Sequence, residues 1–273
     1  MIRFLAGYTS SVPLNHPRIC YESYAATVTG TAGKTYNGDV VTNEYTYERW
    51  DGADPLMECG DPEGECGSEG WGIVGALTLD FINAKPLSYV AVAAHTLKDY
   101  HITLEWSLDG VTYTELHSGV ETSDNPLIFV FTEVTARYVR FSAYGGEVGV
   151  IYCGRILELQ RGIYAGHTPI TLSRTTVKNL NRSVKGQFLG TSIVRTGLSS
   201  SYQASNIPID WYETNIEPLS LHARTKPFFV AWNPLEHPTH TVYGYAQGDI
   251  KPTLSGVINM CEFSFDLDGY VTV

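Results

Sequence analysis

The sequence of 273 residues is poor in cysteine and in charge, and it contains no long apolar run. Its five cysteines are odd in number and form no C-x-x-C pair, which argues against a complete secreted disulfide framework. No segment approaches the length of a membrane-spanning helix, so we expect no membrane insertion. With 17% charged and 43% apolar residues, the composition predicts a folded globular chain rather than a disordered one.

Two further absences concern export and the thiols. The first 17 residues lack the long apolar core and small-residue cleavage site of a signal peptide, so we expect synthesis in a cytoplasm without export by the usual route. Cys59 and Cys66 are near enough in sequence to close a small loop, or they remain reduced. Cys153 and Cys261 are expected to pack as small apolar groups.

Motifs that carry catalysis are missing as well. The sequence has no G-x-S-x-G elbow, no H-E-x-x-H, no phosphate-binding glycine loop and no dinucleotide fingerprint. The most suggestive group is Glu236, His237 and His240, but Pro234 and Pro238 make that segment a loop, and we predict a turn with exposed histidines rather than a metal site. We therefore expect no enzyme activity, no cofactor and no metal.

Charge is distributed unevenly along the chain. Residues 1–162 carry 21 acidic and 10 basic side chains, a net charge of −11, whereas residues 163–273 carry 8 of each. An acidic surface disfavours nucleic acid as a partner. Residues 51–70 hold seven of the acids and no base, which leaves two interpretations, a solvated loop or a calcium-binding loop without the usual spacing.

Period-two patterns dominate the middle of the chain and predict β-strands. Residues 102–108 alternate apolar and polar side chains, and Asp109-Gly110 then predicts a hairpin into a second strand over 111–116. In residues 135–141, Val139 and Phe141 share one face. Residues 156–159 predict a closing strand, and long helical patterns are absent, so the sequence indicates an all-β protein.

These strands resemble the discoidin, or coagulation-factor type C, family. Residues 77–94 also match that family, and the resemblance covers about residues 20–162. It implies a galactose-binding-like β-sandwich, preceded by an arm or first strand over residues 1–19. The matching residues are Ser107, Asp109, Gly110, Tyr113, Ala136, Arg137, Tyr138, Val139, Arg140, Ile156, Glu158 and Leu159.

A boundary is expected after Gly162, where a connector containing glycine and proline begins. In residues 163–273, the run 228–232 is apolar throughout and predicts a strand buried on both faces. Residues 261–268 alternate strictly and predict a strand with one wet face. We therefore predict a second β-sandwich with a core that includes Phe228, Phe229, Trp232, Phe263 and Phe265.

Four stretches of the second half, residues 188–197, 227–238, 243–253 and 262–270, carry a further resemblance. In their order they are similar to proteins at the distal end of the tail tube in long-tailed bacteriophages. This resemblance implies a structural virion protein at the tail tip that forms a ring with itself, a hexamer being favoured, and that joins neighbouring tail-tube and tail-tip or baseplate proteins. It also implies synthesis in the host cytoplasm and release by lysis.

The aromatic residues near the start of the first domain are candidates for ligand contact. In discoidin-like domains this region lies in loops at one end of the sandwich, so Tyr45, Tyr47, Trp50 and Trp71 are the expected contact residues. Alternatively, Trp50 and Trp71 belong to the core. The resemblance thus allows two functions, a tail ring whose outward domain binds host-surface sugars, or a carbohydrate-binding module for host recognition without a ring.

Overall fold

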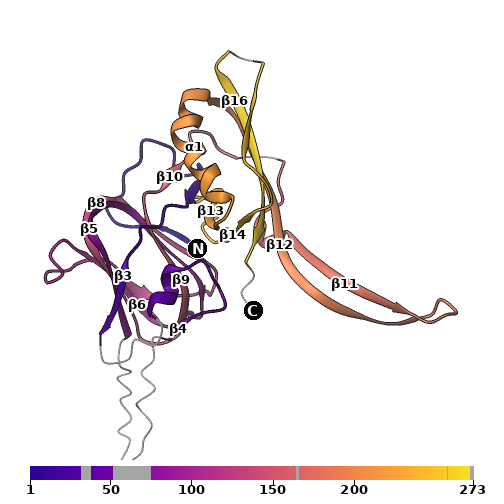
Figure 1. The fold of residues 1–273 in the computed structure, drawn as a ribbon, viewed down its shortest axis with the longest axis horizontal. Helices are drawn as coiled ribbons and strands as arrows, with labels where there is room; N and C mark the ends of the chain where they lie inside the picture. The colour runs from indigo at the N-terminus through magenta and orange to yellow at the C-terminus, as the bar shows by residue number, and fades with distance from the viewer. Residues whose placement is uncertain (32–37, 52–74, 164–165, 257, 271–273) are drawn as a thin grey trace, which may run out of the picture. The chain divides into compact units, whose positions relative to one another are not determined.

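The computed structural model describes the whole chain except residues 32–37, 52–74, 164–165, 257 and 271–273 (Figure 1). It confirms the all-β prediction, because two antiparallel sheets are accompanied by a single longer helix among the described residues. The chain divides into two compact units. Unit 1 comprises residues 1–10 and 22–156, and unit 2 comprises residues 11–21 and 157–273.

Unit 1 is built on eight strands in the order β4-β9-β5-β8-β6-β7, with β3 added to β5 and β1 added in parallel to β8. Its helical element is the 3-10 turn η1 (Gly38–Thr42). The strand bounds are β1 (Ile2–Phe4), β3 (Thr27–Thr31), β4 (Trp50–Asp51), β5 (Gly75–His95), β6 (His101–Ser107), β7 (Thr114–Val120), β8 (Leu127–Ala143) and β9 (Glu147–Gly154).

The long strands β5 and β8 fold this sheet over its own core. The first part of β5 pairs with β3 and the end of β8, whereas its second part pairs with β9 and the start of β8. Between the two parts the register shifts, and Ile82 adopts a φ of 67°. Each layer contributes its inward side chains to one core, which includes Leu77, Val90, Phe129 and Phe141.

The predicted hairpin is present as β6 and β7, with Ile102 and Leu104 buried in the core of unit 1. Its second strand was predicted over 111–116 but begins at Thr114, because residues up to Tyr113 belong to the turn. Leu108 falls outside the strand and is 55% exposed, because the turn begins directly after Ser107. The predicted pairing of Val139 and Phe141 on a buried face is confirmed.

The expected closing strand of the first domain belongs instead to unit 2. Strand β10 (Leu157–Glu158) pairs with β2 (Arg18–Cys20), and β2 pairs in turn with β13 (Phe228–Ala231). The chain therefore leaves unit 1 at Ile156. The first 21 residues are likewise shared, since β1 lies in unit 1 and β2 in unit 2, whereas the sequence suggested one arm over 1–19 and a boundary after 162.

Unit 2 has the strand order β10-β2-β13-β14-β16-β12-β11, with β15 paired to β16. The alternation predicted for 261–268 is confirmed in β16, and the apolar run at β13 is buried throughout. The five aromatic residues proposed for this core are all buried. The remaining elements are η2 (Ile170–Leu172), β11 (Arg174–Arg182), β12 (Phe188–Pro208), α1 (Ile209–Ala223), β14 (Thr241–Ala246), β15 (Lys251–Leu254) and β16 (Met260–Gly269).

Helix α1 of unit 2 was not predicted from the sequence patterns. It buries Tyr212, Ile216 and Leu219, which are spaced four and three residues apart, against the core of unit 2. Pro218 lies inside the helix, and proline is ordinarily a helix breaker. The apolar stripe is short, so the packing of these three side chains, rather than intrinsic propensity, stabilises the helix.

A two-stranded ribbon formed by β11 and the first half of β12 projects from the rest of unit 2 (Figure 1). All nine residues of β11 are exposed, as are residues 188–196 of β12. Strand β12 reaches the main sheet at Leu198, where its pairing with β16 begins. Within the part of the chain that the structure describes, the ribbon beyond this point pairs with nothing else.

Candidate functional site

Two of the four predicted contact residues form an exposed aromatic pair on unit 1. Tyr45 and Tyr47 lie between η1 and β4, and their side chains are 47% and 75% exposed. The ring centroids are 5.5 Å apart with an interplanar angle of 35°, so the two rings contact each other while part of each ring is open to solvent. The backbone N–H of Tyr45 donates to Asn43 Oδ1 at 2.8 Å, and Asn43 Nδ2 donates to Glu48 at 2.8 Å, which holds the segment in shape.

An ion pair ties this segment to the start of β9. Arg49 donates from Nη1 to Glu147 at 2.9 Å, with about a quarter of the arginine side chain and nearly half of the carboxylate side chain exposed. The close approach of the two elements also depends on Gly149, because a Cβ there would lie 3.2 Å from the carbonyl oxygen of Glu48. The tyrosine pair is therefore anchored to the sheet and flanked by charged hydrogen-bonding groups.

Two further tyrosines lie at this end of the sheet and were missed by sequence reasoning. Tyr100 precedes β6 and is 42% exposed, and Tyr144 follows β8 and is 47% exposed. The Tyr100 ring packs over the turn at Gly145 and Gly146, where any Cβ would clash. Tyr144 meets the His101 ring edge-on at 5.3 Å. That turn runs directly into Glu147, the partner of Arg49, so both groups of tyrosines lie at the same end of the sheet. The four tyrosines and the ion pair are here called the tyrosine rim.

The other two predicted contact residues are not available at this rim. Trp50 is 3% exposed and belongs to the core of unit 1, so its prediction as a ligand contact is corrected to the alternative interpretation. Its position in β4, paired with Val148 of β9, directs the indole inward. Trp71 lies outside the described residues, as do Cys59, Cys66 and most of the acidic stretch 51–70.

A buried histidine supports the loop that carries Tyr100. The Leu97 backbone N–H donates to His95 Nδ1 at 3.4 Å, and His95 Nε2 donates to the carbonyl oxygen of Asn125 at 2.9 Å. Both ring nitrogens are thus used by the neutral imidazole. Burial lowers the pKa of His95 to about 4, although the bond to Asn125 and the charge of Asp124 act in the opposite direction.

His237 and His240 of unit 2 form a ring stack rather than a chelating group. His237 and His240 are parallel, with centroids 4.8 Å apart, and His237 also stacks on Trp232 at 5.1 Å. Burial and the neighbouring His237 lower the pKa of His240. Within the described ranges, no group of three or more histidine, cysteine, aspartate or glutamate residues is arranged to hold a metal ion.

The sequence also carried expectations about the cysteines and about membrane-spanning helices. Cys153 and Cys261 are buried free thiols, as expected for cysteines that pack as small apolar groups, and Cys20 is a buried free thiol as well. Burial raises the pKa of all three thiols. No helix in the described part of the chain is long and apolar enough to cross a membrane.

Comparison with known proteins gives similarity to carbohydrate-binding modules at low identity. No family model matches the chain, and no curated protein matches it. A pectin-binding module is similar at 14% identity and a TM-score of 0.37, covering 49% of this chain and 92% of that one. The family 32 module of AlyQ, solved with 4,5-unsaturated mannuronic acid, has 19% identity and a TM-score of 0.36, covering 49% and 96%.

A third similar structure is chitosan-binding module 1 from the chitosanase/glucanase of Paenibacillus sp. IK-5. It has 16% identity and a TM-score of 0.37, and the match covers 50% of this chain and 98% of the module. Similarity at this level does not specify a ligand.

Proposed function

We propose that unit 1 is a carbohydrate-binding domain whose tyrosine rim receives the sugar. The observation that carries the proposal is the pair formed by Tyr45 and Tyr47, two partly exposed aromatic rings in mutual contact on a segment that is tied to the sheet. Aromatic rings of this kind offer apolar faces to the C–H side of a sugar ring, while neighbouring polar groups bond its hydroxyls.

The polar groups of the rim suit a neutral glycan. Arg49 can donate to ring or hydroxyl oxygens, and Glu147 can accept from hydroxyl groups, with side chains that are partly exposed and already held in place. The net charge of −11 over residues 1–162 repels polyanions. We therefore expect neutral hexoses or N-acetylhexosamines to bind in preference to uronic acids.

A glycan array followed by titration calorimetry tests this proposal. The double variant Tyr45→Ala/Tyr47→Ala should lose roughly tenfold to a hundredfold in affinity, because each stacked ring contributes on the order of 0.5–1.5 kcal/mol beyond its buried area. The matched control is Tyr245→Ala, a tyrosine of unit 2 that is 44% exposed. Unchanged affinity of the double variant for every glycan bound by the wild type would refute the proposal.

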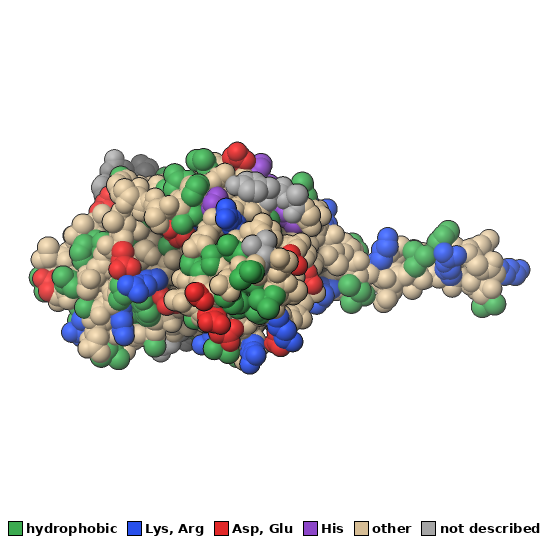
Figure 2. Space-filling model, turned by 90° about the horizontal axis from the view of Figure 1, so that it is seen from above, with side chains coloured by type: hydrophobic (Ala, Val, Ile, Leu, Met, Phe, Trp, Pro, Cys, Tyr) green, Lys and Arg blue, Asp and Glu red, His purple; other side chains and the backbone are tan. Residues whose placement is uncertain are grey.

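A second function is favoured by the ribbon of unit 2, namely self-assembly. Its exposed side chains include Leu180, Phe188, Leu189, Ile193 and Val194, each between 46% and 68% exposed. Isolated two-stranded ribbons are marginally stable in water, and exposed apolar strands are sites of pairing with other chains. Figure 2 shows cationic and apolar side chains gathered along this projection.

The two faces of the ribbon differ, which supports docking through one of them. The strand register places Lys178 opposite Ile193 and Arg182 opposite Phe188 on the same face, and Leu180 lies between them. Arg182 also covers the Phe188 ring at 4.4 Å. The opposite face carries mostly small polar residues, including Asn179, Asn181 and Ser192.

The partner that fits this face is a second copy of the chain. Residues 174–208 contain five cations and no acid, whereas residues 1–162 carry a net charge of −11. Opposite charges on two parts of one chain favour contacts between copies. Repeated head-to-tail contacts of this kind close into rings when the rotation allows it.

We propose on this basis that the protein is a ring-forming subunit at the distal end of a bacteriophage tail. The resemblance in the second half of the sequence supports the virion setting, a hexameric ring and tail-tube and tip proteins as neighbours. The ribbon supplies the contact between subunits, and unit 1 supplies recognition of host-surface sugars. The carbohydrate-binding function does not depend on the ring.

Light scattering during gel filtration tests the self-assembly. A variant in which residues 175–196 are replaced by a short glycine-containing turn should be monomeric under conditions in which the wild type is oligomeric. Ile193→Asp should weaken assembly, and Leu235→Asp, a change at a residue 59% exposed outside the ribbon, should not. A wild-type protein that remains monomeric at about 100 µM, or an oligomer unaffected by loss of the ribbon, would overturn the assignment.

A further inference from the structure

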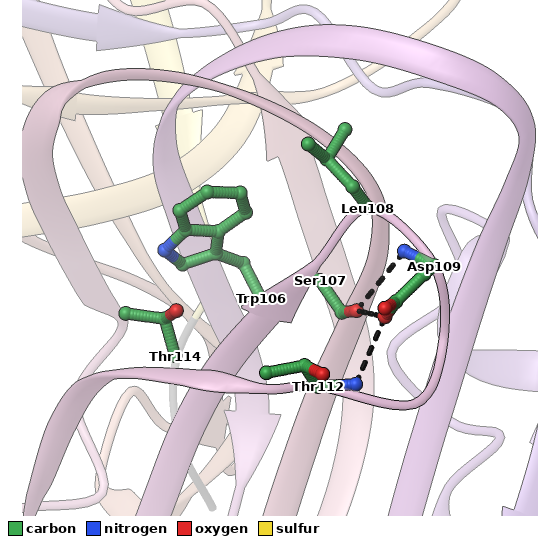
Figure 3. Close-up of a pocket in the computed structure, with 6 residues that line it drawn as sticks. All are labelled: Trp106, Ser107, Leu108, Asp109, Thr112 and Thr114. Atoms are coloured by element: carbon green, nitrogen blue, oxygen red, sulfur yellow. Dashed lines mark hydrogen bonds between the residues drawn. The ribbon is translucent and has the colours of Figure 1, made fainter.

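The turn between β6 and β7 borders a small cavity on unit 1 that is open to solvent on one side (Figure 3). Its volume is about 220 Å³, which is below the roughly 300–1,000 Å³ of sites for drug-sized ligands. The size suits a single sugar ring or a comparable small molecule. The lining residues are Trp106, Ser107, Leu108, Asp109, Thr112 and Thr114.

The turn that shapes this cavity is held by a dense set of hydrogen bonds. Ser107 Oγ donates to Asp109 Oδ1 at 2.9 Å and accepts from the Gly110 N–H at 3.0 Å. The N–H groups of Val111 and Thr112 both donate to Asp109 Oδ1 at 2.9 Å. Gly110 has a φ of +75°, and a Cβ there would lie 3.1 Å from the Tyr138 ring. The walls are therefore fixed before any ligand arrives.

Several polar groups of the cavity have unused bonding capacity. Asp109 Oδ1 accepts all of the bonds described, while Oδ2 bonds to none of the residues that the structure describes. The same holds for the side-chain hydroxyls of Thr112 and Thr114 and for the indole N–H of Trp106. The bonds from Thr112 and Val111 lower the pKa of Asp109 to about 2, so the free oxygen is an ionised acceptor at neutral pH.

The apolar part of the cavity lies directly beside these groups. Trp106 pairs with Thr114 across the hairpin, and its partly buried indole packs against the core of unit 1. Leu108 and Val111 stand at the turn and are 55% and 83% exposed, although turn residues are ordinarily polar. An aromatic wall, an apolar rim and several free hydrogen-bonding groups therefore meet in one small space.

We propose that this cavity is a second binding site, one that takes a single neutral pyranose ring. The sugar presents its C–H face to the indole of Trp106 and its hydroxyls to Asp109 Oδ2 and the two threonine hydroxyls. The ionised carboxylate disfavours anionic sugars. The site is independent of the tyrosine rim and uses none of its residues.

The cavity and the tyrosine rim lie near opposite ends of β6. His101, at the start of β6, touches the rim residue Tyr144, whereas the cavity begins at Trp106 near the other end of that strand. A strand of seven residues spans roughly 20 Å, so one sugar ring cannot occupy both sites. Two sites on one domain would bind a polysaccharide with an avidity that neither site has for a monosaccharide.

Fluorine NMR of protein labelled with 5-fluorotryptophan tests this site, with the Trp106 resonance assigned from a Trp106→Phe variant. We expect a saturable shift of this resonance with at least one of the methyl glycosides of glucose, galactose, mannose and N-acetylgalactosamine, with millimolar Kd. Thr114→Val should raise Kd by roughly threefold to tenfold, as expected for one hydrogen bond. Thr103→Val, a change on the same hairpin outside the cavity, should leave Kd unchanged.

The tyrosine-rim variant separates the two proposals. Tyr45→Ala/Tyr47→Ala should retain the Trp106 shift, so failure of one site does not imply failure of the other. A Trp106 resonance that does not move with any of these glycosides at about 50 mM would overturn the second site. Equal Kd values for the wild type and Thr114→Val would overturn the assigned hydroxyl contact and, with it, the sugar pose.

Discussion

Acidification should destabilise unit 1 through His95, whose two ring nitrogens are both committed in the neutral form. Nδ1 accepts from the Leu97 N–H, and Nε2 donates to the Asn125 carbonyl. Protonation would place a hydrogen on Nδ1, directly against another N–H donor. The buried imidazolium would thus lose one hydrogen bond and gain a repulsive contact in a site that water does not reach.

The size of the effect follows from the pKa of His95. Burial holds it at about 4 in the folded protein, against about 6.5 in the unfolded chain. The unfolded chain therefore binds the proton first, so this contribution to stability is complete above about pH 6.5 and is lost as the pH falls to about 4. Each tenfold difference in proton affinity is worth about 1.4 kcal/mol, so the total loss is about 3 kcal/mol.

Urea denaturation of unit 1 between pH 7 and pH 4 measures this loss. The control is His95→Gln, because its amide can still donate to Asn125 but does not titrate. The difference in unfolding free energy between wild type and variant isolates His95 from every other titrating group. It should shrink by about 3 kcal/mol between pH 7 and pH 4. A difference that stays constant over this range would refute the reasoning.

Three further predictions concern packing in unit 1. Arg3 donates a hydrogen bond at 2.7 Å to the fully buried carboxylate of Glu121. Arg3→Met should therefore lower the unfolding free energy by roughly 3–5 kcal/mol in urea denaturation. A decrease below about 1 kcal/mol would contradict this pairing. Trp50→Ala should lower the unfolding free energy by roughly 3–5 kcal/mol, whereas Tyr47→Ala should change it by no more than about 0.5 kcal/mol. Equal effects would contradict the assignment of Trp50 to the core and of Tyr47 to the surface. Gly146→Ala should destabilise the fold by more than about 1 kcal/mol in thermal melting, because Gly146 has a φ of +81° and a Cβ there would lie 2.4 Å from a backbone oxygen. An unchanged Tm would contradict this prediction.

Strands were predictable where one face is buried and the other is wet. Residues 261–268 alternate because every second side chain lies in the core, and in β6 the same holds for Ile102 and Leu104. Helix α1 was not predictable, since its three buried side chains are few and Pro218 interrupts the pattern. Strand β10 was assigned to the wrong unit because a two-residue strand shows its pairing partner, β2, only in three dimensions.

The tyrosine rim was predictable only where its residues are close together in the sequence. Aromatic residues close together in sequence indicated Tyr45 and Tyr47, but the same pattern included Trp50, and sequence alone does not say which ring turns inward. Tyr100 and Tyr144 were missed because they join the rim from distant segments, through contacts at a glycine turn. The ribbon and its projection became visible only in the structure (Figure 1).

The central claim is that sugar binds to unit 1 at the tyrosine rim, and tyrosine-selective NMR tests it most directly. The intact protein, labelled with 3-fluorotyrosine, would be titrated with a glycan identified on the array, and the resonances would be assigned from single Tyr→Phe variants. The account predicts saturable shifts at Tyr45 and Tyr47 that share one Kd, with Tyr245 of unit 2 unmoved. Shifts confined to tyrosines of unit 2, or binding that leaves Tyr45 and Tyr47 unaffected, would contradict it.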